Sequence, residues 1–287
     1  MKRNKAFVDK KDLLYLIATP IGNLNDLTLR AKEIISSCDL VACEDTRNTG
    51  FLLAKINVSK PLISVHEHNE SSQSEEIIKR IKKEHIKVCY VSDAGYPGIS
   101  DPGEILVKKC LENDINISVV PGPSAFLNAL VGSSIDTSHF LFYGFLDART
   151  SRAEKELTEI KTLPFTLIFY ESPHRIKKTI ALMLKVLGER NACLVREISK
   201  INEEYIYGTL KELNDIDETT LKGEMVIVID KYVNEENINE ISEDELLKTI
   251  KEDLKEGKSK KDITSEMVNN LKINKKIIYK MFSKLEK

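Results

Sequence analysis

Residues 88–103 have the sequence VCYVSDAGYPGISDPG. Val88 to Val91 are apolar or β-favouring and run directly into a polar segment rich in glycine and proline, which predicts a buried strand that opens into a ligand loop. The glycines permit positive φ angles, and Asp93 and Asp101 bring carboxylates to the mouth of the loop. In open α/β sheets, ligands bind outside the carboxyl ends of strands. A plain structural turn, a phosphate loop or a metal loop also fits, although the GxGxxG and P-loop spacings are absent.

Other predicted strands also end in polar clusters. Leu13–Ala18 precedes Thr-Pro-Ile-Gly-Asn, Leu40–Cys43 precedes Glu-Asp-Thr-Arg, and Leu62–Val65 precedes His-Glu-His-Asn-Glu. Helical patterns separate these strands, and Ser72 with Glu75 matches a capping box for the third helix. The alternation of strands and helices predicts an α/β fold with a largely parallel sheet and helices on both faces.

A second α/β domain is predicted after the Pro-Gly-Pro segment at residues 121–123, because two prolines cannot continue a strand and would stiffen a linker. We expect domains at residues 11–121 and 122–232, the second with a mixed sheet. From residue 242 to 287 the pattern changes to three Lys-rich helices, the first with a capping box at Ser242 and Glu245. This helical extension is weak evidence for nucleic-acid binding, since a Lys-rich face is usually a solvated face.

Composition narrows the class of protein. The chain has 287 residues, 41% hydrophobic content and a formal net charge of −2, which excludes a generally basic nucleic-acid binder. The basic N-terminus is not followed by a signal-peptide core, and no apolar run approaches a membrane span, so we expect a cytoplasmic protein without a membrane partner. The five cysteines form no CxxC pair and lie mostly in apolar segments, which favours buried free thiols.

Two polar clusters at strand ends allow several interpretations. Glu44 and Asp45 are suited to acid/base chemistry, but the nearby Arg47 also fits a structural ion pair. His66 and His68 alternate at a strand end and could bind a metal, contact RNA or complete a turn. A third metal ligand with sensible spacing is missing, so we expect no metal site.

A third cluster follows the predicted strand at residues 165–170. His174 and Arg175 lie at the start of a helix shortly after Glu171, where a phosphate contact and an internal ion pair are equally plausible. Serine hydrolase chemistry lacks its GxSxG turn, and cysteine chemistry lacks an exposed thiol. No single cluster decides the function.

Several strings together resemble the bacterial 16S ribosomal RNA cytidine 2′-O-methyltransferase family, a branch of the tetrapyrrole methylase superfamily. In order, they are TPIGNLNDLTLRA, EDTRNTGFLL, HEHNE, VSDAGYPGISDPG, VPGPSA, GFL, TLIFYESPHR and GEMVIVI. The resemblance covers about residues 11 to 232, and the Lys-rich tail is similar, more loosely, to the family's helical extension. The chain departs from the family at Tyr96, where the family usually has threonine, and a ring there can reshape the cofactor loop.

The resemblance implies two α/β domains with S-adenosylmethionine in the cleft between them, a homodimer, and methylation of a cytidine ribose in the 16S RNA of the small ribosomal subunit. The implied cofactor-binding residues are Pro20, Ser92, Asp93, Ala94, Gly95, Ile99, Ser100, Asp101, Ser124, Ala125, Tyr170 and Met225. The candidate bases are Glu44, Asp45, His66, Glu67 and Asp101, with the acidic and histidine clusters favoured. The implied RNA contacts are Arg47, His68, His174 and Arg175.

Three other functions stay open. A related methyltransferase of a small molecule, such as a corrin precursor, would keep the fold and cofactor, but the polar strings suit a nucleotide better than an apolar trough. A non-catalytic ribosome-binding protein would bind RNA independently of the cofactor. A nicotinamide-dependent oxidoreductase is disfavoured because the glycine fingerprint is absent after the first strand.

Overall fold

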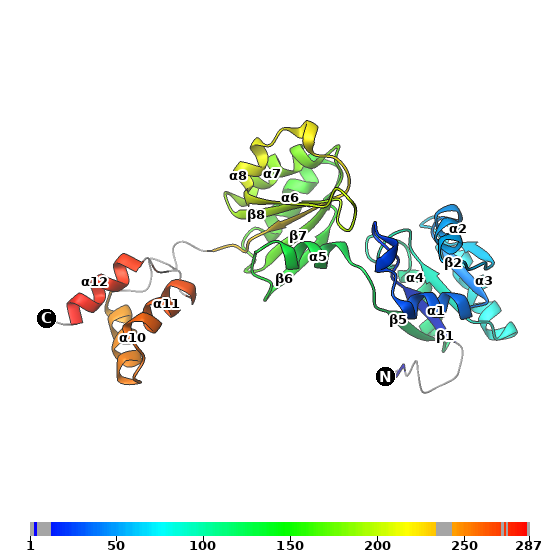
Figure 1. Cartoon of the computed structure of the whole chain (residues 1–287), viewed down its shortest axis with the longest axis horizontal. Coiled ribbons are helices and arrows are strands. Elements are labelled where there is room, and N and C mark those ends of the chain that lie inside the picture. Colours follow the sequence, from blue (N-terminus) through cyan, green and yellow to red (C-terminus); the bar gives the residue numbers. More distant parts are fainter. Residues whose placement is uncertain (1–2, 5–12, 234–242, 271–272, 274, 286–287) are drawn as a thin grey trace. The chain divides into compact units, whose positions relative to one another are not determined.

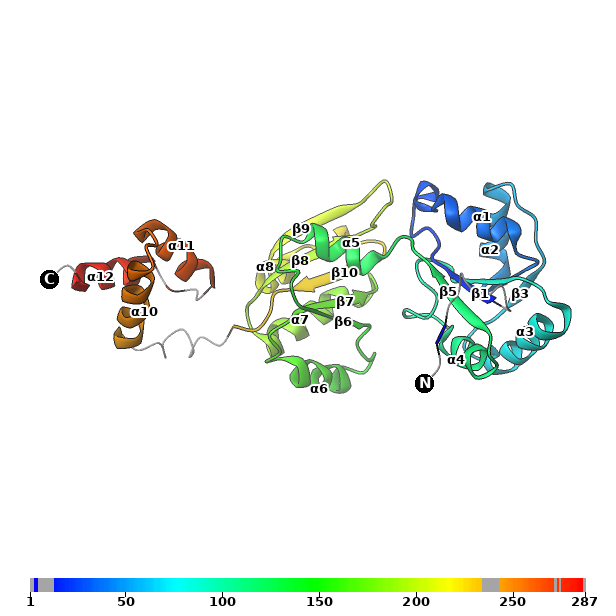
Figure 2. The same ribbon diagram turned by 90° about the horizontal axis from the view of Figure 1, so that it is seen from below.

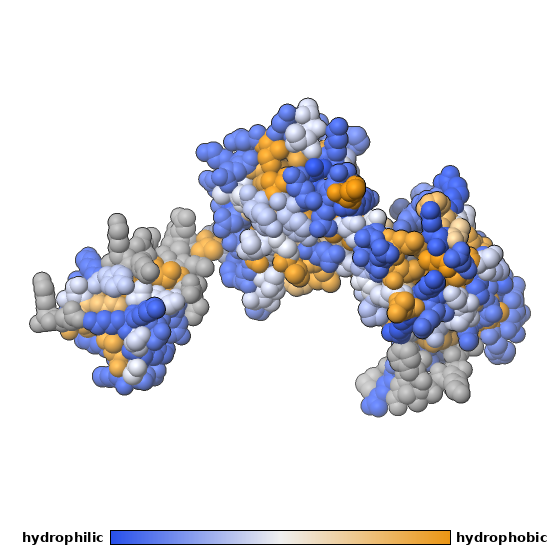
Figure 3. All heavy atoms as spheres, viewed as in Figure 1, coloured by the Kyte–Doolittle hydropathy of each residue, from blue (hydrophilic) through white to orange (hydrophobic). Residues whose placement is uncertain are grey.

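The computed structural model describes residues 3–4, 13–233, 243–270, 273 and 275–285 (Figure 1). The chain divides into two compact units, Met1–Lys231 and Tyr232–Lys287, which are described separately. Among the described residues, no helix is long and apolar enough to cross a membrane. The visible face carries hydrophobic patches separated by hydrophilic residues (Figure 3). The domain boundaries predicted within and after the first unit stay predictions.

The first five strands form one parallel sheet in the order β3-β2-β4-β1-β5. The strands are β1 (Leu13–Ile17), β2 (Leu40–Cys43), β3 (Leu62–Ser64), β4 (Val88–Val91) and β5 (Asn116–Val120). The helices between them are α1 (Leu29–Ser37), α2 (Thr46–Lys55), α3 (Glu70–Glu84) and α4 (Glu104–Glu112). The predicted parallel sheet is confirmed, and its carboxyl strand ends share one edge.

β4 is the middle strand of this sheet and is covered on both faces. Val88 and Tyr90 pack into the core beneath α3 and α4, whereas Cys89 and Val91 pack beneath α1 and α2. A strand buried on both sides needs a continuous apolar run, which explains the sequence at its position. All five cysteines are buried and free, as predicted.

The second sheet is mixed, with the order β6-β7-β10-β8-β9. Its strands are β6 (Phe140–Gly144), β7 (Thr166–Glu171), β8 (Asn191–Arg196), β9 (Glu204–Thr209) and β10 (Met225–Ile229). β6 pairs with β7 in parallel, and the other pairs are antiparallel. The predicted mixed sheet is therefore confirmed.

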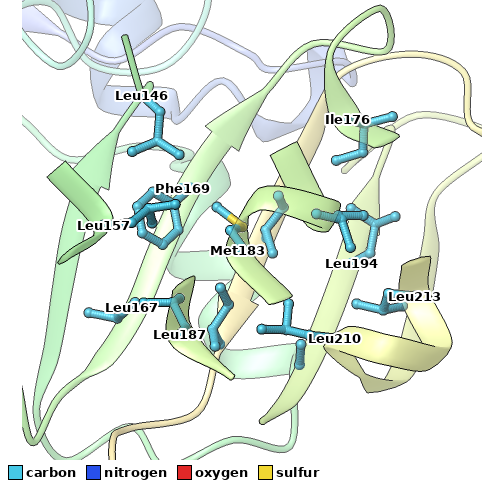
Figure 4. Close-up of a cluster of buried hydrophobic side chains, with 14 of the residues drawn as sticks. Leu146, Leu157, Leu167, Phe169, Ile176, Met183, Leu187, Leu194, Leu210 and Leu213 are labelled. Carbon is cyan, nitrogen blue, oxygen red and sulfur yellow. The ribbon is translucent and has the colours of Figure 1, made fainter. Parts of the chain in front are cut away.

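Helices cover both faces of the second sheet. On one face, α6 (Thr150–Ile160), α7 (Ile176–Leu187) and α8 (Leu210–Asp215) contribute to a core in which Leu157 and Met183 surround Phe169 of β7 (Figure 4). On the other face, α5 (Ala125–Gly132) packs Ala129 and Leu130 against β8 and β10 (Figure 2). Residues 121–124 connect β5, the last strand of the first sheet, to α5, which packs on the second sheet.

One predicted helix cap is wrong. α3 begins at Glu70, so Ser72 lies inside the helix rather than at its N-cap, which is Asn69. The Asn69 side chain instead closes the preceding turn, accepting from the His66 N–H and donating to the Ser64 carbonyl. Glu70 is therefore the first residue of the helix. The other predicted box, at Ser242, lies outside the described residues.

The second unit contains the three predicted helices, α10 (Glu243–Lys255), α11 (Lys260–Asn270) and α12 (Lys275–Leu285). They share a small apolar core, formed by Leu246, Ile250, Ile263, Met267, Ile273, Ile278, Met281 and Phe282. Leu254 and Ile277 lie on the same helices but are exposed. The helices are therefore amphipathic, with one buried apolar stripe.

Candidate functional site

A cavity of about 300 Å³ lies beside the loop that follows β4. The loop contributes Ala94, Gly95, Tyr96, Ile99, Ser100 and Asp101, and the start of α5 contributes Ser124 and Ala125. The remaining lining residues are Ile21, Phe145, Tyr170, Glu171, Ser172, Pro173, Ile198, Glu224, Met225 and Val226. The segment predicted to be a ligand loop thus borders a cavity that both sheets help to form.

The first half of the loop is tied to the end of β1. Thr19 and Gly95 exchange two backbone hydrogen bonds of 2.9 and 3.0 Å, and the Thr19 hydroxyl donates to the Ser92 carbonyl. Ser92 is buried, and its hydroxyl donates to the Gly95 carbonyl at 3.1 Å. Gly95 has φ of +76°, which a residue with a Cβ adopts only with strain. Ser92 therefore shapes the turn rather than lining the cavity.

The second half of the loop is held by Glu70, the last residue of the HEHNE string. The Glu70 side chain is buried, and its Oε1 accepts from the N–H groups of Gly103 and Leu106 at 2.9 and 3.1 Å. Gly103 has φ of +143°, and a Cβ there would lie 3.0 Å from the Tyr90 ring. These contacts fix the backbone two residues after Asp101, so the position of Asp101 depends on a carboxylate in another helix.

Asp101 has an unusual electrostatic environment. Burial raises the pKa of this carboxyl group to about 6, and the negative charges of Glu44 and Asp93 contribute to the increase. A hydrogen bond with Ser92 opposes the shift but does not cancel it. Asp101 thus changes protonation state close to neutral pH, and it borders the cavity.

The other candidate bases gather at the ends of β2 and β3, outside the cavity lining. The Ser64 hydroxyl donates to the Glu44 carbonyl at 3.0 Å, which joins the two strand ends. Burial raises the pKa of Glu44, with contributions from nearby carboxylates. His66 is half-buried and Glu67 is exposed. Among the described residues, no group of three or more His, Cys, Asp or Glu side chains could hold a metal ion.

Asp45 and Asp93 form a hydrogen-bonded group on the same edge. Asp45 accepts from the backbone N–H and the guanidinium of Arg47, and these bonds lower the pKa of Asp45 to about 2. Asp93 accepts from the Asn48 side chain at 2.6 Å and from the Asp45 N–H at 3.4 Å. Asp93 is therefore occupied by α2 and its N-cap, not by the cavity.

Nine of the residues predicted to bind a cofactor line the cavity, namely Ala94, Gly95, Ile99, Ser100, Asp101, Ser124, Ala125, Tyr170 and Met225. Pro20, Ser92 and Asp93 do not. Ile198 lines it without any local signal, because only the pairing of β8, β10 and β7 brings it there. Glu224 also lines it, beside the predicted Met225 in the GEMVIVI string. Tyr96 lines it too, and its hydroxyl accepts from the Gly122 N–H at 3.0 Å, which ties the loop to the segment between the sheets.

The predicted RNA contacts fall into two groups. Arg47, paired with Asp45, and His68 are exposed near the ends of β2 and β3. His174 is exposed after β7, whereas Arg175 is largely occupied by structural contacts. Its guanidinium lies 3.4 Å from the buried Glu171 carboxylate and donates to two backbone carbonyls at 3.0 and 3.3 Å.

Comparison with known proteins identifies the family. Residues 13–214 match the family described as Tetrapyrrole (Corrin/Porphyrin) Methylases. Ribosomal RNA small subunit methyltransferase I of Streptococcus pyogenes serotype M3 is 35% identical over 288 residues, covering 99% of this chain and 100% of the relative. The Bacillus subtilis protein of the same name is 41% identical over 239 residues, 82% of each chain.

Solved structures with the same fold are more distant in sequence. The methyltransferase CobJ has a TM-score of 0.58 and 16% identity, covering 78% of this chain and 98% of that one. Uroporphyrin III C-methyl transferase of Thermus thermophilus has a TM-score of 0.54 and 18% identity, covering 76% and 97%. These confirm the predicted tetrapyrrole methylase fold. With relatives aligned over nearly its whole length, the chain belongs to the ribosomal RNA small subunit methyltransferase I family of tetrapyrrole methylases.

Proposed function

We propose that this chain transfers a methyl group from S-adenosylmethionine to the ribose 2′-hydroxyl of a cytidine in the 16S RNA of the small ribosomal subunit. Relatives from three bacterial groups carry the name of small-subunit ribosomal RNA methyltransferase. The observation that carries the proposal is the cavity with Asp101 in its wall, beside the loop after β4.

The lining of the cavity fits S-adenosylmethionine in size and chemistry. Its volume is at the lower end of the range of small-molecule sites, about 300 to 1,000 Å³. Ile99, Ile198 and Met225 offer apolar walls for an adenine ring, and the backbone of Ala94 offers hydrogen-bonding groups. Asp101 adds a carboxylate suited to a cationic ligand. When bound, the cofactor supplies a methyl group on a positively charged sulfonium, which is a good leaving centre.

Asp101 is the proposed general base. A carboxylate with pKa of about 6 is ionised at neutral pH, yet is a stronger base than an ordinary aspartate. It would accept the proton of the ribose 2′-hydroxyl while that oxygen becomes the nucleophile. The Thr19 to Gly95 bonds and the Glu70 contacts hold the loop, so the carboxylate is pre-positioned. The other candidate bases would then influence the electrostatic potential at the carboxyl edge of the first sheet rather than accept the proton. These are Glu44, Asp45, His66 and Glu67.

Exposed basic groups would bind the RNA backbone. Arg47, His68 and His174 are available for phosphate contacts, and the Lys-rich second unit would add salt-dependent attraction. The substrate is RNA rather than DNA because the acceptor is the 2′-hydroxyl itself. Removal of residues 242–287 is expected to weaken RNA binding and to leave cofactor binding unchanged, since these residues belong to a separate compact unit.

We further propose that the protein works as a cytoplasmic homodimer, with α/β domains at residues 11–121 and 122–232. The family resemblance supports the dimer, and exposed apolar side chains on α5, Leu127 and Val131, are compatible with a contact surface. Light scattering after size-exclusion chromatography would give twice the chain mass for a dimer and 32.6 kDa for a monomer.

The test is transfer of labelled methyl from S-adenosylmethionine to small ribosomal subunits that lack the modification, followed by nuclease digestion. Label on one ribose-methylated cytidine is the expected result. Label at a base, or no label with cofactor binding intact, would contradict the proposal. In the second case, transfer to corrin precursors would support the small-molecule alternative. RNA affinity with no cofactor binding would support the non-catalytic one.

A further inference from the structure

Phe145 is a large aromatic residue in the cavity wall and has no role in the proposed proton and methyl transfer. It belongs to the GFL string, and its side chain is 52% exposed. When a flat ligand packs on an exposed aromatic ring, apolar surface of both is removed from water, and this removal favours binding. The ring is therefore a candidate contact for a ligand.

The backbone directs Phe145 outward. The pairing of β6 and β7 shifts register between Phe142 and Gly144, and Gly144 has φ of +82°. Such bulges turn a strand locally and redirect a side chain, often beside active sites. The next residue, Leu146, is buried in the core with Leu157 and Phe169 (Figure 4). The chain thus anchors one side chain inside and presents its neighbour to the cavity.

The residues that follow Phe145 in its loop are held by two side chains. Arg175 donates to the carbonyls of Leu146 and Asp147 at 3.0 and 3.3 Å. The Asp147 N–H donates to the Glu156 carboxylate at 3.0 Å. A ring on a braced loop loses little conformational freedom when a ligand binds, so more of the contact energy appears as affinity.

Phe145 is the exposed end of a series of aromatic contacts. Phe126 stacks on Phe142 with ring centroids 4.4 Å apart, and Phe142 meets Tyr170 edge-on at 4.9 Å. Tyr170 meets Phe145 edge-on at 5.6 Å. The first three rings are partly buried and support one another, whereas the last has exposed surface facing the cavity. A planar, unpaired base would extend the series by one ring.

Basic side chains lie on the same loop and on the helix that follows. Arg149 and Arg152 both pair with Asp147, with N to O distances of 2.8 and 3.5 Å, and their side chains are 58% and 60% exposed. One carboxylate thus holds two guanidinium groups near each other, and their exposed N–H groups are candidate donors to a phosphate. An aromatic ring beside two such arginines is a combination that suits single-stranded RNA.

We propose that Phe145 is the platform on which the base of the target nucleotide stacks, with Arg149 and Arg152 binding an adjacent phosphate. The inference rests on the proposed function and names the RNA subsite of that reaction. A base lifted from its neighbours loses stacking, and the Phe145 ring replaces part of it, which holds the attached ribose beside Asp101.

The test compares Phe145→Ala with Phe145→Tyr and with Phe140→Ala. The Phe140 ring is 41% exposed at the start of β6, the strand that Phe145 follows. Loss of one base stack raises the KM for small subunits by about 5-fold to about 150-fold. Phe145→Ala is expected to show this loss, while Phe145→Tyr and Phe140→Ala stay within about 2-fold of the parent chain. Calorimetric binding of S-adenosylhomocysteine is expected to stay unchanged in all three.

Two results would overturn the inference. If Phe145→Ala weakens S-adenosylhomocysteine binding as strongly as it weakens subunit binding, the ring is a wall of the cofactor site. If it changes neither, the ring has no ligand role. Failure of the proposed function is a separate result, because the parent chain would then transfer no methyl group to subunits before any variant is compared.

Discussion

Two loops leave the same edge of the first sheet and carry similar residues in different environments. The loop after β2 contains Asp45, which is partly exposed and bound by Arg47, so its pKa falls to about 2. The loop after β4 contains Asp101, which is partly buried beside other carboxylates, so its pKa rises to about 6. A carboxylate at a strand end is therefore a poor guide to chemistry until its neighbours are known.

The difference originates in the residues that hold each loop. Arg47 lies two positions after Asp45 and stabilises its charge directly. Asp101 is instead held through the backbone, by the Glu70 carboxylate at Gly103 and by the Tyr90 hydroxyl, which donates to the Pro102 carbonyl. Holding the backbone fixes a side chain without neutralising it, which is the arrangement that a general base needs.

The largest expected effect separates the two carboxylates directly. Asp101→Asn removes the proposed base and is expected to lower the single-turnover rate of methyl transfer by about 10²-fold to 10⁴-fold. Asp45→Asn is expected to lower it by less than about 10-fold, because that carboxylate is bound by Arg47 and does not border the cavity. A larger loss at Asp45 than at Asp101 would make the loop after β2 the catalytic one.

The pH dependence sharpens the same contrast. Below pH of about 6 the rate is expected to fall about tenfold per pH unit, because protonated Asp101 cannot accept a proton. Glu44→Gln removes a negative charge that raises the pKa of Asp101, so the inflection is expected to move to lower pH. Asp45→Asn is the control and is expected to leave it in place. If neither Asp101→Asn nor Glu44→Gln changes the pH of the inflection, the inflection belongs to another titrating group.

The rigidity of the loop after β4 can be tested at two glycines with positive φ. Gly103→Ala places a Cβ 3.0 Å from the Tyr90 ring and 3.1 Å from the Gly98 nitrogen, so we expect a loss of about 2 to 3 kcal/mol in the free energy of unfolding. Gly98→Ala meets nothing within 4 Å and is strained only by its φ of +82°, so about 1 kcal/mol is expected. Denaturant titration measures both, and equal losses would contradict a tightly held Gly103.

Local patterns predicted the fold well because each buried segment carries apolar residues at the spacing of its strand or helix. The four apolar residues of β4 identify a strand covered on both faces, and the apolar spacing of the C-terminal helices identifies their small core. The site was predicted less fully. Glu70 belongs to a string of polar residues that suggests an exposed turn, yet its partners lie 33 and 36 positions away at the start of α4. Ile198 reaches the cavity only through strand pairing in the second sheet, which no local pattern encodes.

The smallest expected effect is on stability, and it has opposite signs in the two loops. A raised pKa means that folded Asp101 binds its proton more tightly than the unfolded chain does, so stability falls as pH rises from about 4 to about 6 and stays lower above. Asp101→Asn removes this penalty. The shift from 3.8 to about 6 corresponds to at most about 3 kcal/mol, which partial solvent exposure reduces to about 1 kcal/mol.

Calorimetry near pH 7.5 is expected to show a higher melting temperature for Asp101→Asn and a slightly lower one for Asp45→Asn. Near pH 4 the gain at Asp101 is expected to vanish, because the carboxyl group is then protonated in the folded chain. A gain of equal size at both pH values would mean that packing, rather than charge, distinguishes Asp101 from Asp45.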